Sequence, residues 1–140
     1  MDKNTINILI IEDSKTDALL IKEAFKTIED VIFKIKHIYN GKDINNQLNN
    51  FIPHIILLDL DLPGKHGLQI LQEIKISEQH RHIPVIIYTS SDSSEDITQS
   101  YQEYASGYII KGFNFDEIIT KLSILTNYWA KLVQLPINED

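Results

Sequence analysis

The sequence predicts an α/β fold, a doubly wound parallel sheet of five strands that alternate with five helices, (βα)5. Two observations support this prediction. Short apolar, β-branched runs alternate five times with segments in which apolar residues recur at helical spacing. The runs at 55–58 and 85–88 are apolar throughout, which is typical of strands buried on both faces of a parallel sheet. Right-handed crossovers then place helices on both faces.

The elements follow one another with connections of ordinary length. We expect strands at residues 6–11, 31–38, 55–58, 85–88 and 107–110. We expect helices at residues 15–28, 43–50, 68–77, 92–104 and 116–133, the last of them amphipathic with Trp129 and Leu132 on its apolar face. The second strand alternates apolar and basic residues near its end, as an edge strand does. Ser14 can cap the first helix, with Asp17 in the capping-box position.

Composition limits the classes of function. The 140 residues are 43% apolar and 24% charged, which predicts a single soluble domain, 1–140, with its core at about 6–133 and no output domain. The net charge of −7 argues against nucleic acid as a partner. The absence of a long apolar run argues against a membrane partner, and residues 1–5 lack the pattern of a secretory signal. With no cysteine, the chain is compatible with a cytoplasmic location.

Side chains able to do chemistry follow four of the five expected strands. They are Glu12 and Asp13 after the first strand, Asp59 after the third, Thr89 after the fourth and Lys111 after the fifth. Because the carboxyl ends of parallel strands share one edge, we expect these side chains to meet there. Crowded carboxylates repel one another unless a cation intervenes, and an all-oxygen site suits Mg²⁺. Asp59 would then be a nucleophile toward phosphorus, with Thr89 and Lys111 holding the phosphoryl oxygens.

Each of these residues also has a simpler interpretation. The acidic pair could be helix-start charges stabilised by the helix dipole, Thr89 a helix cap and Lys111 a solvated loop lysine. Their occurrence together, at the ends of different strands, favours a shared site.

The complete pattern resembles the receiver domain of two-component response regulators and covers essentially the whole chain. The acidic pair is followed by D-x-x-x-P-x-x-x-G, formed by Asp59, Pro63 and Gly67. Thr89 precedes a small residue, Lys111 closes the fifth strand, and Tyr108 stands at the aromatic switch position three residues earlier. The resemblance implies the flavodoxin-like receiver fold with strand order 2-1-3-4-5.

The resemblance also implies roles for individual residues. Asp59 would be the phosphorylation site, and Mg²⁺ would be held by the side chains of Asp13 and Asp59 and the backbone carbonyl of Asp61, with help from Glu12. Thr89 and Lys111 would contact the phosphoryl group, and Thr89 and Tyr108 would form the switch. The side chains of Asp61 and Ser91 would tune hydrolysis of the acyl phosphate. One departure is Gly112, because receivers usually have a cis-proline after the lysine; a looser loop is the implied consequence.

A finer resemblance concerns partners. Residues 108–111 and 128–136 are similar to the small regulators paired with bacterial phytochromes. This implies a stand-alone phosphorelay protein, not an enzyme, that receives its phosphoryl group from a sensor histidine kinase or a phosphotransfer protein. Such regulators are often dimeric, and the signal would leave through a partner or dimer surface around the fourth helix, fifth strand and fifth helix.

Two alternatives remain from the sequence. Asp59-Leu60-Asp61 fits the D-x-D of haloacid-dehalogenase-type phosphatases, although those need further acids downstream. A receiver-like interaction module that is never phosphorylated is the second, and the Gly112 departure supports it. The histidines form no metal-ligand pattern, and we expect His80 and His82 to lie in a solvated loop.

Overall fold

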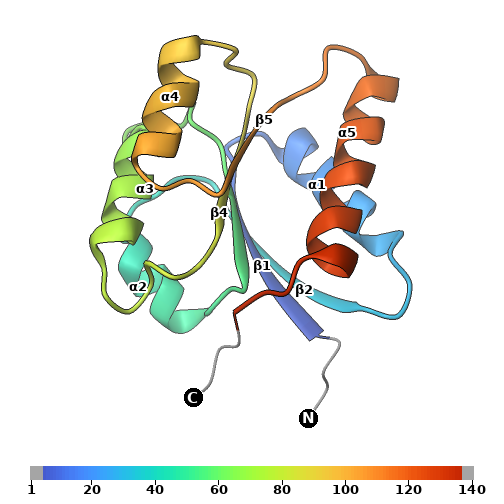
Figure 1. The fold of residues 1–140 in the computed structure, drawn as a ribbon, viewed down its shortest axis with the longest axis horizontal. Coiled ribbons are helices and arrows are strands. Elements are labelled where there is room, and N and C mark those ends of the chain that lie inside the picture. The colour runs from blue at the N-terminus through green and yellow to red at the C-terminus, as the bar shows by residue number, and fades with distance from the viewer. Residues whose placement is uncertain (1–4, 137–140) are drawn as a thin grey trace.

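The computed structural model describes residues 5–136 and shows helices on both faces of a central sheet (Figure 1). The elements are β1 (Thr5–Ile11), α1 (Lys15–Lys26), β2 (Ile32–Ile38), α2 (Ile44–Asn50), β3 (Ile55–Leu58), α3 (Gly67–Ile76), β4 (Val85–Thr89), α4 (Ser94–Gln102), β5 (Gly107–Ile110) and α5 (Phe115–Asn127). The strands are parallel in the order β2-β1-β3-β4-β5, which confirms the predicted fold and places β2 at an edge. The prediction that residues 1–5 lack a secretory signal concerns mostly residues 1–4, which lie outside the described range.

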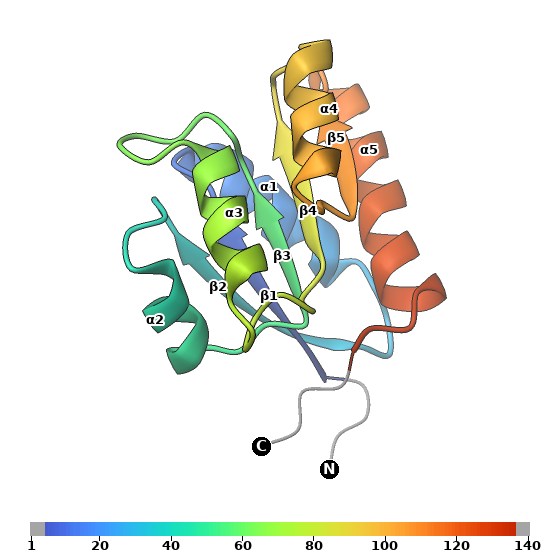
Figure 2. The ribbon, with the colours of Figure 1, turned by 60° about the vertical axis from the view of Figure 1, so that its left-hand side comes forward.

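The sheet separates two apolar clusters. Helices α1 and α5 cover one face and α2, α3 and α4 the other, as the two views in Figure 1 and Figure 2 show. Every residue of β3 and β4 is buried, as the continuous apolar runs at 55–58 and 85–88 predict. Successive strand residues point to opposite faces, so Leu57 packs in the cluster beneath α1 and α5 while Leu58 packs in the cluster beneath α3.

The strand register brings the carboxyl ends together at one edge. Ile11 pairs with Leu58, and Leu58 pairs with Ile87. Thr89, the last residue of β4, pairs with Ile110, the last of β5. The residues that follow these positions therefore share the edge that carries the candidate site.

The last helix differs from its prediction. Helix α5 ends at Asn127 and continues as a π-helical turn, Tyr128–Leu132, in which Val133 N–H donates to the Tyr128 carbonyl at 3.0 Å. The wider turn changes the helical periodicity on which the apolar face was predicted. Trp129 still packs against the core, but Leu132, predicted to lie on that face, is 75% exposed.

The loop before β4 is also less solvated than predicted. His80 is only 4% exposed, and its ring nitrogens lie 2.9 Å from Asn45 Oδ1 and 3.0 Å from Asn49 Oδ1. Both asparagines belong to α2, so His80 ties that short helix to the loop after α3. The prediction of a solvated loop holds for exposed His82 and is wrong for His80. Over residues 5–136, no helix has the length and apolar character that crossing a bilayer requires.

Candidate functional site

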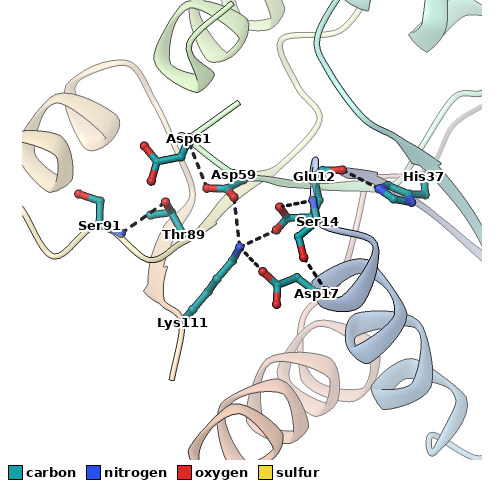
Figure 3. Close-up of polar contacts among 9 residues, drawn as sticks. All are labelled: Glu12, Ser14, Asp17, His37, Asp59, Asp61, Thr89, Ser91 and Lys111. Atoms are coloured by element: carbon teal, nitrogen blue, oxygen red, sulfur yellow. Dashed lines mark hydrogen bonds and ion pairs between the residues drawn. The ribbon is translucent and has the colours of Figure 1, made fainter. Parts of the chain in front are cut away.

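Lys111 is the centre of the site, because its ammonium contacts three carboxylates from different parts of the chain. Its Nζ lies 2.7 Å from Glu12 Oε1, 2.8 Å from Asp17 Oδ2 and 3.1 Å from Asp59 Oδ2 (Figure 3). Glu12 follows β1, Asp59 follows β3 and Lys111 follows β5, so residues distant in sequence meet at the edge that the register creates. Glu12, Asp59 and Lys111 are all buried, which shields their charges from water.

Three acids in this pocket could hold a metal ion. Ligand oxygens of Glu12, Asp13 and Asp59 all lie within 4.8 Å of one another. Asp13 is exposed while the other two are buried, so the group opens to solvent on the Asp13 side. A set of carboxylate oxygens with access for water fits Mg²⁺, which keeps several of its waters when bound.

Among the described residues, the Asp61 side chain is not part of the acid group that could hold a metal ion. Its carboxylate is exposed and lies on the side of Asp59 away from Glu12 (Figure 3). Its backbone N–H donates to Asp59 Oδ1 at 3.1 Å. Both oxygens of the Asp59 carboxylate therefore have a hydrogen-bond donor, one from Asp61 and one from Lys111.

The pocket shifts the ionisation of two of its groups. Burial raises the pKa of the Glu12 carboxyl to about 7, although the hydrogen bond from Lys111 acts in the opposite direction. Burial would lower the pKa of the Lys111 ammonium, but the hydrogen bonds to Asp17 and Glu12 outweigh it and raise that pKa overall. Lys111 is thus a firmly protonated cation beside Asp59.

Backbone geometry fixes Asp59 where β3 ends. Its N–H donates to the Ile11 carbonyl at 3.0 Å, which continues the β1–β3 ladder by one residue. The chain then turns, and Gly67 N–H donates to the Leu60 carbonyl at 3.0 Å at the start of α3. The loop that carries Pro63 and Gly64 is thereby closed against the backbone of Asp59 and Leu60.

Thr89 and Tyr108 both connect to the loop after β4. The hydroxyl of Thr89, which is fully buried, accepts a long hydrogen bond of 3.5 Å from Ser91 N–H. The Tyr108 hydroxyl donates to the Ser91 carbonyl at 3.0 Å, and Ser91 Oγ donates to Asp96 of α4 at 2.6 Å. Ser91 therefore links the site edge to both β5 and α4.

The sequence interpretation missed Asp17 as a member of the pocket. The sequence predicts that Asp17 stands in the capping-box position opposite Ser14. Ser14 does cap α1, with its Oγ accepting from Asp17 N–H at 3.2 Å. The Asp17 carboxylate, however, is directed to Lys111, and Ser14 N–H donates instead to Glu12 Oε2 at 3.2 Å. The position of Asp17 in the first turn of the helix after the acidic pair was the available signal.

Comparisons with known proteins identify the family of the chain. The response regulator receiver domain family matches residues 8–123. The response regulator Rcp1 of Synechocystis is 30% identical over 138 residues, covering 92% of each chain. Among solved structures, the Mn²⁺-bound form of Rcp1 has a TM-score of 0.88 at 30% identity and covers 94% of this chain and 99% of that one.

A phosphorylated relative is similar to the same degree. The phosphorylated cyanobacterial phytochrome response regulator RcpA has a TM-score of 0.88 at 29% identity, over 95% of this chain and 99% of that chain. The family match spans well over half of the sequence, and the relatives extend over nearly all of it. The chain therefore belongs to the response regulator receiver domain family and is related to phytochrome response regulators.

Proposed function

We propose that Asp59 accepts a phosphoryl group from a phosphohistidine of a sensor histidine kinase or phosphotransfer protein. A carboxylate oxygen of Asp59 attacks phosphorus, an O–P bond forms, and the N–P bond breaks to release the imidazole. The observation that carries the proposal is the contact of Asp59 with the Lys111 ammonium at 3.1 Å, in a pocket shared with Glu12 and Asp13. Phosphoryl transfer depends mainly on positioning and charge neutralisation, and this pocket offers both.

We assign Mg²⁺ to the oxygens of Glu12, Asp13 and Asp59 and to the backbone carbonyl of Asp61. When bound, the ion neutralises charge on the phosphoryl oxygens and on the crowded carboxylates. The chain's own residues do the remaining work. Lys111 donates to a phosphoryl oxygen, and the Thr89 hydroxyl, which is on the same edge, donates to another.

The signal would pass from Thr89 to the surface formed by α4, β5 and α5. Movement of Thr89 toward the phosphoryl group breaks its contact with Ser91 and so disturbs the carbonyl on which Tyr108 is docked. We propose that phosphorylation biases an equilibrium between docked and released Tyr108. Beside Tyr108 lies a groove of about 490 Å³ that Tyr101, Tyr128 and Trp129 also line, and aromatic residues are common at interfaces.

We further propose a histidine kinase of the bacterial phytochrome class as donor and a second copy of the chain as one occupant of this surface. The relationship to RcpA, described as a phytochrome response regulator, supports the donor class. We place the protein in the cytoplasm, where a kinase that consumes ATP would meet it. In this role the chain is a signalling protein that is itself phosphorylated and dephosphorylated.

Labelling of the full chain with acetyl phosphate and Mg²⁺ tests the central claim. We expect the wild type to gain one phosphoryl group by intact-mass spectrometry and Asp59→Asn to gain none. Asp116→Asn is the matched control, because it removes an exposed acid at the start of α5, outside the pocket. Equal labelling of wild type and Asp59→Asn would refute the assignment of Asp59.

The same experiment addresses the alternatives. A chain that binds Mg²⁺ but takes no label from acetyl phosphate or from a kinase would be an unphosphorylated receiver-like module. The haloacid-dehalogenase alternative is not favoured, because the acids that meet Asp59 come from upstream, after β1, and the chain belongs to the receiver family.

A further inference from the structure

We propose that Asp17 is a positioning residue, which keeps the Lys111 ammonium beside Asp59 while a divalent cation occupies the carboxylates of the pocket. The inference rests on the proposed function, since it concerns how Lys111 is held ready for the phosphoryl group. It begins from the 2.8 Å contact between Asp17 Oδ2 and Lys111 Nζ, which joins the first turn of α1 to the end of β5 (Figure 3).

The hydrogen-bonding capacity of Lys111 shows why a separate acid is needed. An ammonium has three N–H donors, and here they face Glu12, Asp17 and Asp59. Glu12 and Asp59 belong to the group of acids that can hold a metal ion, together with Asp13. A divalent cation on that group takes up the negative charge that attracts Lys111 and repels the ammonium directly.

Asp17 stands outside the metal-binding group and retains its full charge when that group is occupied. Its carboxylate is 30% exposed, against 2% for Glu12 and 5% for Asp59, so it sits at the outer side of the ammonium. Of the three acids on Lys111, Asp17 is the one that can hold the ammonium in the pocket at the moment when phosphoryl transfer needs it.

The local structure of α1 directs Asp17 to this task. An acid three residues after a capping serine ordinarily accepts from the backbone N–H of that serine. In this chain Glu12 Oε2 accepts from Ser14 N–H, which leaves the Asp17 carboxylate available to Lys111. The centroid of the Tyr88 ring lies 5.5 Å from Lys111 Nζ, so the ring limits the positions that the lysine side chain can adopt.

The first test measures Mg²⁺ binding, which requires no phosphorylation. Without Asp17, Lys111 is held only by Glu12 and Asp59 and competes more strongly with Mg²⁺ for these two carboxylates. Calorimetry of Asp17→Asn should therefore give a Mg²⁺ affinity about five- to tenfold weaker than that of wild type. Asp17→Glu, which keeps the carboxylate, should bind within about twofold of wild type. Glu23→Gln removes the same charge from an exposed position of α1 and should leave the affinity unchanged. Equal affinities for Asp17→Asn and Glu23→Gln would overturn the proposal.

The second test measures the rate of phosphorylation by acetyl phosphate at saturating Mg²⁺. We expect Asp17→Asn to lower the maximal rate about tenfold, with recovery in Asp17→Glu. In a Lys111→Met background the Asp17→Asn change should have no further effect, because the residue acts through the lysine. Independent, multiplicative losses in the double variant, or a wild-type rate for Asp17→Asn, would contradict it. If the wild type takes no label, the proposed function fails. If the wild type is labelled and Asp17→Asn is labelled at the same rate, this inference alone fails.

A third measurement needs no substitution and covers the case in which Asp17→Asn does not fold. Hydrogen exchange of the Lys111 ammonium, followed by ¹⁵N NMR of the wild-type chain, should stay slow when Mg²⁺ is added, because Asp17 continues to accept a hydrogen bond. Fast exchange in the Mg²⁺-loaded protein would show that the ammonium has left Asp17 and would overturn the proposal.

Discussion

Gly67 lies so close to Asp59 that a side chain at position 67 would overlap the Asp59 carbonyl oxygen and the Leu60 Cα atom. Gly67 is the first residue of α3, and its N–H donates to the Leu60 carbonyl at 3.0 Å. The start of α3 is thus seated directly on the backbone of the proposed phosphoacceptor, which explains in steric terms why a glycine occupies the last position of the D-x-x-x-P-x-x-x-G pattern.

We therefore expect Gly67→Ala to move Asp59 relative to Lys111. Because backbone atoms must shift to admit the methyl group, unfolding by urea should show a loss of about 1–3 kcal/mol, and the labelling rate should fall about tenfold or more. Gly64→Ala is the control: its φ of 77° makes alanine unfavourable, but nothing lies within 4 Å of the added carbon. A labelling rate that falls equally in both variants would show that strain in the loop, rather than contact with Asp59, is responsible.

Gly112 provides a second steric prediction. A Cβ atom there would lie 2.7 Å from Ile118 N and 2.9 Å from the carbonyl carbon of Glu117, both backbone atoms of α5. Gly112→Ala should push α5 away from the residue that follows Lys111 and cost about 1–3 kcal/mol of stability in urea. The sequence implied a looser loop at this position; a stability unchanged by alanine would agree with that looseness and contradict the close packing.

The sequence predicted those features that follow from strand order and periodicity. Continuous apolar runs identified β3 and β4, and the shared edge of parallel strands predicted that Glu12, Asp59 and Lys111 lie close together. Features that depend on how side chains reach between elements were not predictable in this way. Asp17 crosses from α1 to the end of β5, and the burial of His80 depends on how α2 packs.

Tyr108→Phe should separate docking of the ring from phosphorylation. The variant loses only the hydroxyl that donates to the Ser91 carbonyl, a bond worth about 0.5–1.5 kcal/mol. We expect an unchanged labelling rate but faster amide hydrogen exchange for the loop between β4 and α4, measured by mass spectrometry. Tyr104→Phe is a suitable control, since that ring is 74% exposed and follows the other end of α4. Unchanged exchange in Tyr108→Phe would remove Tyr108 from the proposed switch.

His80 should contribute stability that is lost on mild acidification. Burial, with a smaller contribution from the charge of His82, lowers the pKa of His80 below its ordinary value of 6.5. In the unfolded chain His80 binds a proton as the pH falls through 6.5, whereas in the folded chain it resists until lower pH. At His80 the unfolded state therefore binds more protons in that window, so the contribution of His80 to the free energy of unfolding decreases as the pH is lowered from about 7 toward 5. Glu12 contributes with the opposite sign, because its raised pKa makes the folded state bind the proton first.

Urea unfolding of wild type and His80→Gln across this pH range tests the assignment. His80→Gln keeps a polar side chain for Asn45 and Asn49 but cannot take a proton, so wild type should be the more stable at pH 7 by a margin that narrows as the pH falls toward 5. His82→Gln, at an exposed position, should keep most of the wild-type slope because it removes only the smaller cause of the pKa shift. If His80→Gln has the wild-type pH dependence of the free energy of unfolding and His82→Gln does not, the exposed histidine and not the buried one is responsible for the loss of stability in acid.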